Sequence, residues 1–353
     1  MFYRDCSAAA SIISAPMALK FGHNTTAEEA TTLLANEIRG KNVLITGTSL
    51  NGLGFEAART IAKHANLVII TGYNLARLRR SEIELKRNVV KANIRTLVLD
   101  LASLAAVRTA AAEVNAYNEP IHVLINNAAS ALCDFTLTPD GFEHQMAVDH
   151  FGPFLFTALI LPKILSSCSA TFTPRILYVS SSAHAWVDGV DFAELEHPTE
   201  NAHNPMTAHA QAKSANILIA SELARRVGGR VNVYSLTPGA VETGFFMKAS
   251  EEGREEMLLR DIIREDGTVS RNAFPWKTVA QGAATLVTAA FDPSLNDKPG
   301  CYLSNSMEHN AGVAPHAADP VQAQELWALS ERLAGVRFSF DCLVPQTIPK
   351  SYW

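Results

Sequence analysis

The 353-residue sequence lacks the features that mark several large classes of protein. It has only 5 cysteines, none in a C-x-x-C spacing, so neither a disulfide framework nor a cysteine metal site is indicated. It has no run of Lys or Arg and a formal net charge of −5, which argues against nucleic acid as a partner. No apolar run reaches the roughly 20 residues of a membrane span. We therefore expect a cytoplasmic protein in a reducing compartment.

The 11 histidines do not show the spacing of metal ligands either. None of them falls in an H-E-x-x-H arrangement, in which two imidazoles on one helix face would bind zinc. We therefore predict no metal site.

Short apolar runs alternate with helical patterns along most of the chain. Seven runs predict buried strands: 42–46, 67–71, 96–100, 123–126, 175–180, 231–236 and 301–304. Helical patterns lie at 54–65, 75–91, 103–117, 140–167, 207–227 and 276–290. Strands that are hydrophobic throughout and alternate with helices are typical of a parallel sheet covered on both faces. The predicted class is α/β, with a single Rossmann-type doubly wound parallel sheet of about seven strands.

No repeat or low-complexity linker divides this series. We expect one domain over residues 21–335, a loosely ordered amino terminus over 1–20, and a carboxy-terminal tail over 336–353. The charged, amphipathic segment 244–275 interrupts the alternation after the sixth strand. Ligands bind beyond the carboxyl ends of the strands in such sheets, so this insertion is expected to be a lid over a substrate pocket. The alternative is a solvated surface helix.

A glycine-rich turn follows the first predicted strand, in "VLITGTSLNGLGFEAARTIAKH" (43–64). Gly47, Gly52 and Gly54 permit a tight turn and let the backbone approach a pyrophosphate near the start of a helix. Glycine spacing alone is a weak signal, but its place after the first strand of a βαβ series strengthens it.

This turn resembles the TGxxxGxG signature of the short-chain dehydrogenase/reductase superfamily, with one residue added. The resemblance is to the branch of retinol dehydrogenases and WW-domain oxidoreductases, and it extends from about residue 21 to 335. Further matching landmarks are Asp100 after the third strand, "NNAA" (126–129), "YVSSSAH" (178–184) and "TPGAVET" (237–243).

The resemblance implies a nicotinamide dinucleotide as cofactor. The residues expected to bind it are Gly47, Ser49, Asn51, Gly52, Leu53, Tyr73, Arg77, Asp100, Leu101, Asn127, Ala128, Lys213, Pro238, Gly239, Val241 and Thr243. Tyr73 stands where NADP-using relatives have an arginine, and no acidic residue is there for an NAD ribose. Because Arg77 could reach a 2′-phosphate, NADP(H) is favoured over NAD(H).

The resemblance also implies four catalytic positions, two of which depart from the family. Ser181 would bond the substrate oxygen, and Lys213 would bond the nicotinamide ribose. His209 replaces the proton-donating tyrosine of YxxxK, and Asp149 replaces the asparagine of the proton relay. An imidazole nitrogen lies about 2 Å closer to the backbone than a tyrosine hydroxyl. An ion pair of Asp149 with Lys213 would draw the lysine away from the relay.

The chemistry of histidine makes the usual proton transfer doubtful. Its pKa starts near 6.5, and a lysine ammonium four residues away would lower it further, because like charges disfavour the protonated form. His209 should therefore be mostly neutral at pH 7, which suits a base or a hydrogen-bond donor better than an acid.

Three functions follow from this combination. The first is NADP(H)-dependent oxidoreduction of a carbonyl or alcohol on a small lipophilic metabolite. The second is a redox-silent enzyme that performs acid–base isomerisation, dehydration or cyclisation, with the cofactor bound but no hydride transferred. The third is a non-catalytic cofactor-binding scaffold. Expected substrate contacts are His184, Trp186, Phe245, Phe246 and Met247. A homodimer through the helices at 140–167 and 207–227 is a further expectation.

Overall fold

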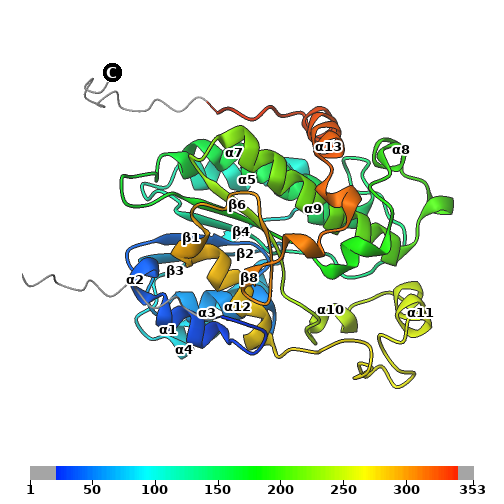
Figure 1. The fold of residues 1–353 in the computed structure, drawn as a ribbon, viewed down its shortest axis with the longest axis horizontal. Helices are drawn as coiled ribbons and strands as arrows, with labels where there is room; N and C mark the ends of the chain where they lie inside the picture. The colour runs from blue at the N-terminus through cyan, green and yellow to red at the C-terminus, as the bar shows by residue number, and fades with distance from the viewer. Residues whose placement is uncertain (1–20, 341–353) are drawn as a thin grey trace, which may run out of the picture.

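An eight-stranded sheet forms the centre of the molecule in the computed structural model, which describes residues 21–340 (Figure 1). The strand order is β3-β2-β1-β4-β5-β6-β7-β8, and all pairs are parallel except β7 with β8. The strands are β1 (Asn42–Ile45), β2 (Leu67–Gly72), β3 (Ile94–Val98), β4 (Val123–Asn126), β5 (Arg175–Val179), β6 (Asn232–Thr237), β7 (Tyr302–Ser304) and β8 (Met307–Glu308). Strands β2 and β3 extend the sheet on one side of β1, and β4 and the later strands extend it on the other side. The strand order therefore reverses between β1 and β4, and the doubly wound α/β sheet is confirmed.

Helices cover both faces of the sheet, because strands that are buried on both sides must be screened from water on both. One face is covered by α1 (Ala27–Leu33), α2 (Ala35–Ile38), α3 (Leu53–Ile61), α4 (Leu75–Asn88) and α12 (Val279–Phe291). The other face is covered by α5 (Leu104–Asn115), α7 (Gly152–Leu165), α9 (Pro205–Val227) and α13 (Pro320–Leu333). Figure 1 shows these two layers below and above the strands.

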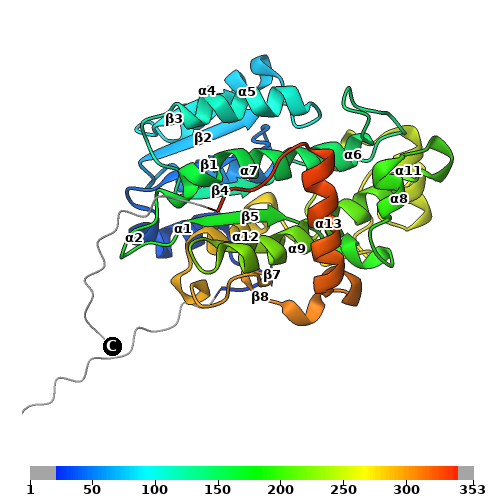
Figure 2. The same ribbon diagram turned by 90° about the horizontal axis from the view of Figure 1, so that it is seen from above.

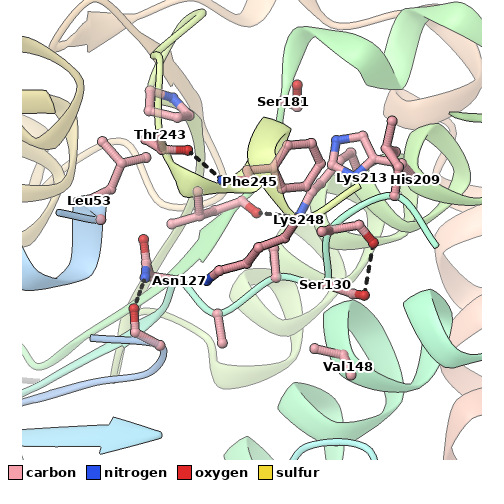
Figure 3. Close-up of a pocket in the computed structure, with 18 of the residues that line it drawn as sticks. Leu53, Asn127, Ser130, Val148, Ser181, His209, Lys213, Thr243, Phe245 and Lys248 are labelled. Carbon is pink, nitrogen blue, oxygen red and sulfur yellow. Dashed lines mark hydrogen bonds between the residues drawn. The ribbon is translucent and has the colours of Figure 1, made fainter. Parts of the chain in front are cut away.

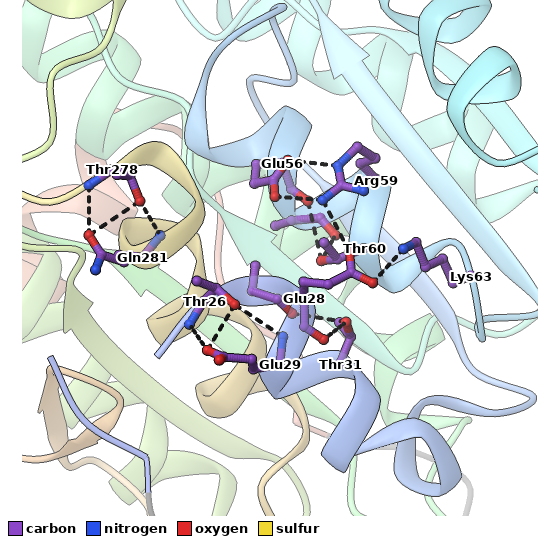
Figure 4. Close-up of polar contacts among 12 residues, drawn as sticks. Thr26, Glu28, Glu29, Thr31, Glu56, Arg59, Thr60, Lys63, Thr278 and Gln281 are labelled. Carbon is purple, nitrogen blue, oxygen red and sulfur yellow. Dashed lines mark hydrogen bonds and ion pairs between the residues drawn. The ribbon is translucent and has the colours of Figure 1, made fainter. Parts of the chain in front are cut away.

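Two helices of the first layer, α1 and α12, begin with side-chain caps (Figure 4). Thr26 and Glu29 form a capping box at the start of α1, and Thr278 and Gln281 form a second one at the start of α12. Glu28 of α1 pairs with Arg59 of α3, which ties the amino-terminal helix to the helix that follows the glycine turn. α1 and α2 were not among the predicted helices.

The helix predicted over 140–167 is interrupted. It consists of α6 (His144–Met146), a π-helical turn (Ala147–Phe151) and α7. Single π turns inside helices are frequent at functional sites. Here the π turn carries Asp149, whose carboxylate is buried in the candidate site described below.

The carboxy-terminal helix α13 packs against α9, and Figure 2 shows it running across that helix. Its Trp327 is fully buried against Phe154 of α7 and against Phe338, and His150 contacts Ser330 through a 2.7 Å hydrogen bond. Most residues of α7 and α9 are buried within the single chain.

The segment 144–165 is long and apolar enough to cross a membrane by length and composition, but 78% of its most apolar window is buried inside the protein. This is the burial expected of a core helix, and α7 packs against α5 and β4.

The predicted insertion folds as α10 (Gly244–Met247) and α11 (Glu251–Leu259), followed by an irregular return to α12. Figure 1 shows both helices to one side of the sheet. Between β5 and α9, a 3-10 turn (Ser182–Trp186) and α8 (Phe192–Glu196) complete this end of the molecule.

Candidate active site

A cavity of about 700 Å³ lies at the carboxyl ends of the parallel strands. Its wall includes residues that directly follow β1, β2, β4 and β6, among them Gly47, Tyr73, Asn127 and Pro238. Its far end is closed by side chains from α9 and from the insertion. One continuous space therefore joins the glycine turn to the region of His209.

The glycine turn is packed too closely for side chains. A Cβ on Gly47, which has φ +70°, would lie 2.6 Å from the Cα of Ala128, and one on Gly54 would lie 2.5 Å from Asn127 Nδ2. Asn127 Nδ2 donates hydrogen bonds to the carbonyls of Thr46 and Gly47 at 2.8 and 3.0 Å. Gly52 is the N-cap residue of α3 and lines the cavity. Because glycine has no side chain, no side-chain hydrogen bond caps the first N–H groups of this helix. This uncapped helix start is suited to an anion.

Most residues predicted to bind a cofactor line this cavity. They are Gly47, Ser49, Gly52, Leu53, Tyr73, Asp100, Leu101, Asn127, Ala128, Lys213, Pro238, Gly239, Val241 and Thr243. Asn51 and Arg77 are not part of its wall. Asn51 holds the turn in a left-handed conformation with φ 60°, and Arg77 Nη1 donates to the Tyr73 hydroxyl at 3.3 Å.

Lys213 and Asp149 form a buried ion pair. Lys213 Nζ lies 2.8 Å from Asp149 Oδ2, and the two side chains are 4% and 1% exposed. The backbone N–H of Ser130 donates to Asp149 Oδ1 at 2.7 Å. Burial raises the pKa of the Asp149 carboxyl, but the Lys213 ammonium and the Ser130 N–H oppose this rise. The expected ion pair is therefore present, and Lys213 is held by a carboxylate.

His209 lines the cavity one helical turn before Lys213. Burial, together with the positive charge of Lys213, lowers the pKa of His209 to about 3. The imidazole is therefore neutral at pH 7, as the sequence predicts, although burial is the larger cause. Its Nδ1 is buried and has no hydrogen-bond partner within residues 21–340. A buried polar atom without a partner needs a ligand or a water.

The three consecutive serines after β5 line the cavity, and their hydroxyls differ in what they contact. Ser180 Oγ donates to the Lys213 carbonyl at 2.7 Å, so its hydrogen is already used. Ser181 Oγ accepts from the backbone N–H of Ala183 at 3.1 Å, which leaves its own hydrogen free to donate. Figure 3 shows Ser181, His209 and Lys213 around the same part of the pocket.

The expected contact of His184 with substrate is not supported. His184 is 1% exposed and does not belong to the cavity wall. Its Nδ1 lies 2.6 Å from the Ser181 carbonyl, and its Nε2 accepts from the N–H of Ala314 at 3.1 Å. Both ring nitrogens are therefore engaged, and His184 fixes the serine turn from behind.

The insertion contributes the apolar end of the cavity. Phe245 packs on the His209 ring at a centroid distance of 5.2 Å, and Trp186 stacks with Phe274 at 6.4 Å. Met257 and Ile262 complete this part of the wall. Of the three insertion residues predicted to contact substrate, Phe245 lines the cavity.

One of the predicted lid contacts is not placed there, and the side chain of another is not described. Met247 is 86% exposed and is not part of the cavity wall, so its predicted contact is wrong in this structure. The side chain of Phe246 lies outside the described residues. Sequence reasoning missed Leu132 and Met206, which pack with Met257 in one small core cluster. It also missed Lys248, whose place after the phenylalanines gave no periodic signal.

Known proteins are similar to this chain in sequence and in fold. The profile of the short chain dehydrogenase family matches residues 41–188, from β1 through Ser181, whereas His209 and Lys213 lie beyond the match. The chain is 34% identical over 321 residues to the human WW domain-containing oxidoreductase, covering 89% of this chain and 72% of that protein. It is 31% identical over 319 residues to the short-chain dehydrogenase TIC 32 A, chloroplastic, of Brassica napus, covering 89% and 94%. A solved structure of an uncharacterised protein from Mycobacterium paratuberculosis has 26% identity and a TM-score of 0.63, with 86% and 98% covered.

Removing one partner of the buried pair should destabilise the fold strongly. Asp149→Ala leaves Lys213 buried without its carboxylate, so the free energy of unfolding should fall by about 3–5 kcal/mol. The matched control is Glu242→Ala in the exposed pair of Glu242 with Arg271, which should cost about 1 kcal/mol or less. Urea unfolding of both variants measures the difference. Equal losses would contradict the structural role of the buried pair.

Proposed function

The chain belongs to the short-chain dehydrogenase/reductase family, and from that premise we propose that it is an NADP(H)-dependent oxidoreductase acting on the carbonyl or alcohol of a small lipophilic molecule. The observation that carries this proposal is the continuous cavity. It begins at an uncapped helix start between glycines and ends at Ser181 and His209 under an apolar wall. Such a cavity offers space for a dinucleotide and a lipophilic substrate side by side.

The residues at the glycine end fit a dinucleotide. The start of α3 would take the diphosphate, since its free N–H groups and the helix dipole favour negative charge. Asp100 and Asn127 would flank the adenosine half, and Lys213 with Gly239 the nicotinamide half. No carboxylate follows β2, where Gly72, Tyr73 and Asn74 stand, and this absence favours the 2′-phosphate of NADP(H).

A bound dinucleotide would supply or accept a hydride at the substrate carbon. The protein would hold the substrate oxygen between the Ser181 hydroxyl, which has a free hydrogen, and the neutral His209 imidazole. A neutral imidazole N–H polarises a carbonyl by hydrogen bonding but does not release its proton as an acid near pH 7. The proton that completes a reduction therefore comes from solvent.

A second function is favoured by the state of the polar groups. His209 is a neutral imidazole with a buried, unpartnered nitrogen that can accept a hydrogen bond from a substrate, although a pKa of about 3 makes it a weak base. Asp149 holds Lys213 at 2.8 Å, away from the family's relay. An acid–base isomerisation, dehydration or cyclisation would use these groups without hydride transfer. The non-catalytic scaffold has no comparable observation in its favour.

The remaining expectations stay proposals. The apolar wall of Phe245, Met257, Ile262 and Phe274 supports a lipophilic substrate. The homodimer through the helices at 140–167 and 207–227 also stays a proposal; α13 packs on α9, whereas α7 packs mainly against α5. The cytoplasmic location also stays a proposal, which rests on the scattered cysteines and on the lack of a long uninterrupted apolar run in the sequence.

Restoring the family's tyrosine should raise reductase activity. His209→Tyr supplies a proton donor with a longer reach, so NADPH oxidation with a panel of lipophilic ketones and aldehydes should increase by roughly 10²-fold over a slow wild type. The control is His309→Tyr at an exposed position outside the cavity. The measurement is the decrease of NADPH absorbance at high enzyme concentration.

Two outcomes would contradict the proposal. If neither the wild type nor His209→Tyr oxidises NADPH with any carbonyl, although both bind it, hydride transfer is not the function. If dinucleotide-free protein converts a substrate at full rate, the acid–base function replaces it.

The preference for NADP(H) should depend on Arg77. This exposed guanidinium lies on the first turn of α4 beside the Tyr73 hydroxyl. The 2′-phosphate is the group that NADPH has and NADH lacks, so a contact with Arg77 would affect NADPH alone. Arg77→Gln should weaken NADPH binding roughly five- to tenfold and leave NADH binding unchanged. Arg80→Gln on the same helix is the control, and titration calorimetry measures both dinucleotides. An equal loss for NADPH and NADH would contradict this role.

A further inference from the structure

Lys248 is a cation of the cavity wall that the family resemblance did not assign. It follows α10 on the insertion, and its backbone N–H donates to the Phe245 carbonyl at 3.3 Å. Within residues 21–340 no carboxylate forms an ion pair with it. The other lysine of the wall, Lys213, is already neutralised by Asp149. Lys248 therefore places an ammonium on the cavity wall that no ion pair among the described residues neutralises.

The direction of this side chain indicates its ligand. Figure 3 shows Lys248 extending from the insertion toward Asn127, away from Ser181. Asn127 donates a hydrogen bond to the Gly47 carbonyl, so it lies at the edge of the glycine turn. Across this edge lies the start of α3, which has its own partial positive charge. Two sources of positive charge, one from the sheet side and one from the insertion, thus face one space.

We propose that Lys248 binds the diphosphate of the dinucleotide and thereby couples cofactor binding to closure of the insertion over the substrate end. The inference rests on the proposed function. A 2′-phosphate is expected instead beside Tyr73 and Arg77, and the substrate end has an apolar wall. The diphosphate is the anion that both the α3 start and Lys248 would contact.

The coupling follows from the place of Lys248 in the chain. Three residues before it, Phe245 packs on His209. After it, Met257 and Ile262 belong to the small core cluster that closes the substrate end. A phosphate contact at Lys248 would fix this segment between the cofactor and the sheet. Segment 249–275 should then be better ordered when the dinucleotide is bound.

The test compares Lys248→Gln with Lys248→Arg and with the control Lys91→Gln, an exposed lysine outside the cavity. Calorimetry with NADPH, NADH and ADP-ribose measures affinity. Lys248→Gln should weaken all three roughly tenfold, because all three contain the diphosphate, whereas Lys248→Arg and Lys91→Gln should stay within about twofold. Hydrogen exchange over 249–275 should slow when NADPH is added to the wild type but not when it is added to Lys248→Gln.

Each other result overturns the inference in a recognisable way. A loss confined to NADPH would assign Lys248 to the 2′-phosphate. Unchanged dinucleotide affinity with a raised KM for carbonyl substrates would assign it to the substrate. Normal binding by Lys248→Gln with normal exchange protection overturns this inference alone. Failure of the wild type to bind any of the three ligands overturns the proposed function together with it.

Discussion

The carboxylate of Asp149 and the ammonium of Lys213, 2.8 Å apart and almost fully buried, constrain the rest of the site. Two charges can be buried at such cost only if their geometry and their other hydrogen bonds are well satisfied. The π turn positions Asp149, the loop after β4 provides the Ser130 N–H, and the long helix α9 carries Lys213. Because Lys213 also stands one turn from His209, its positive charge helps burial to keep that imidazole neutral.

The two ends of the cavity differ in how closely they match what the family resemblance implies. The glycine turn, Asn127 and the uncapped start of α3 form an anion-binding end like that expected for the family. At the other end, neither the tyrosine nor an unengaged lysine is available for the family's proton relay. What is left is a neutral imidazole, a serine hydroxyl and an apolar wall. Such a site can orient and polarise a carbonyl, and it depends on solvent for the proton.

The sheet and the place of the cavity follow from the sequence, because buried strands are continuous apolar runs and ligands bind beyond their carboxyl ends. The ion pair follows only from the family resemblance, which puts Asp149 and Lys213 in one proton relay. Strand β8 has only two residues, too few for a pattern. The π turn could not be predicted, because α7 is apolar and buried on nearly all sides, so a shift of its pattern by one residue leaves no visible signal. His184 and Met247 were misplaced because neighbours in sequence do not share a direction: His184 turns inward to bond backbone, and Met247 points to solvent. The place of Lys248 in the cavity wall could not be predicted, because it depends on how the insertion folds back over the sheet.

The central claim is that His209 is neutral where the family has a proton donor, and its protonation state can be observed directly. Nuclear magnetic resonance of protein labelled with ¹⁵N-histidine, assigned by comparison with His209→Gln, follows the ring nitrogens of His209 with pH. Burial and the charge of Lys213 lower its pKa to about 3, so the signals should remain those of a neutral imidazole throughout the range in which ordinary histidines, with pKa values near 6.5, become protonated. A His209 titration near that ordinary value would contradict the account.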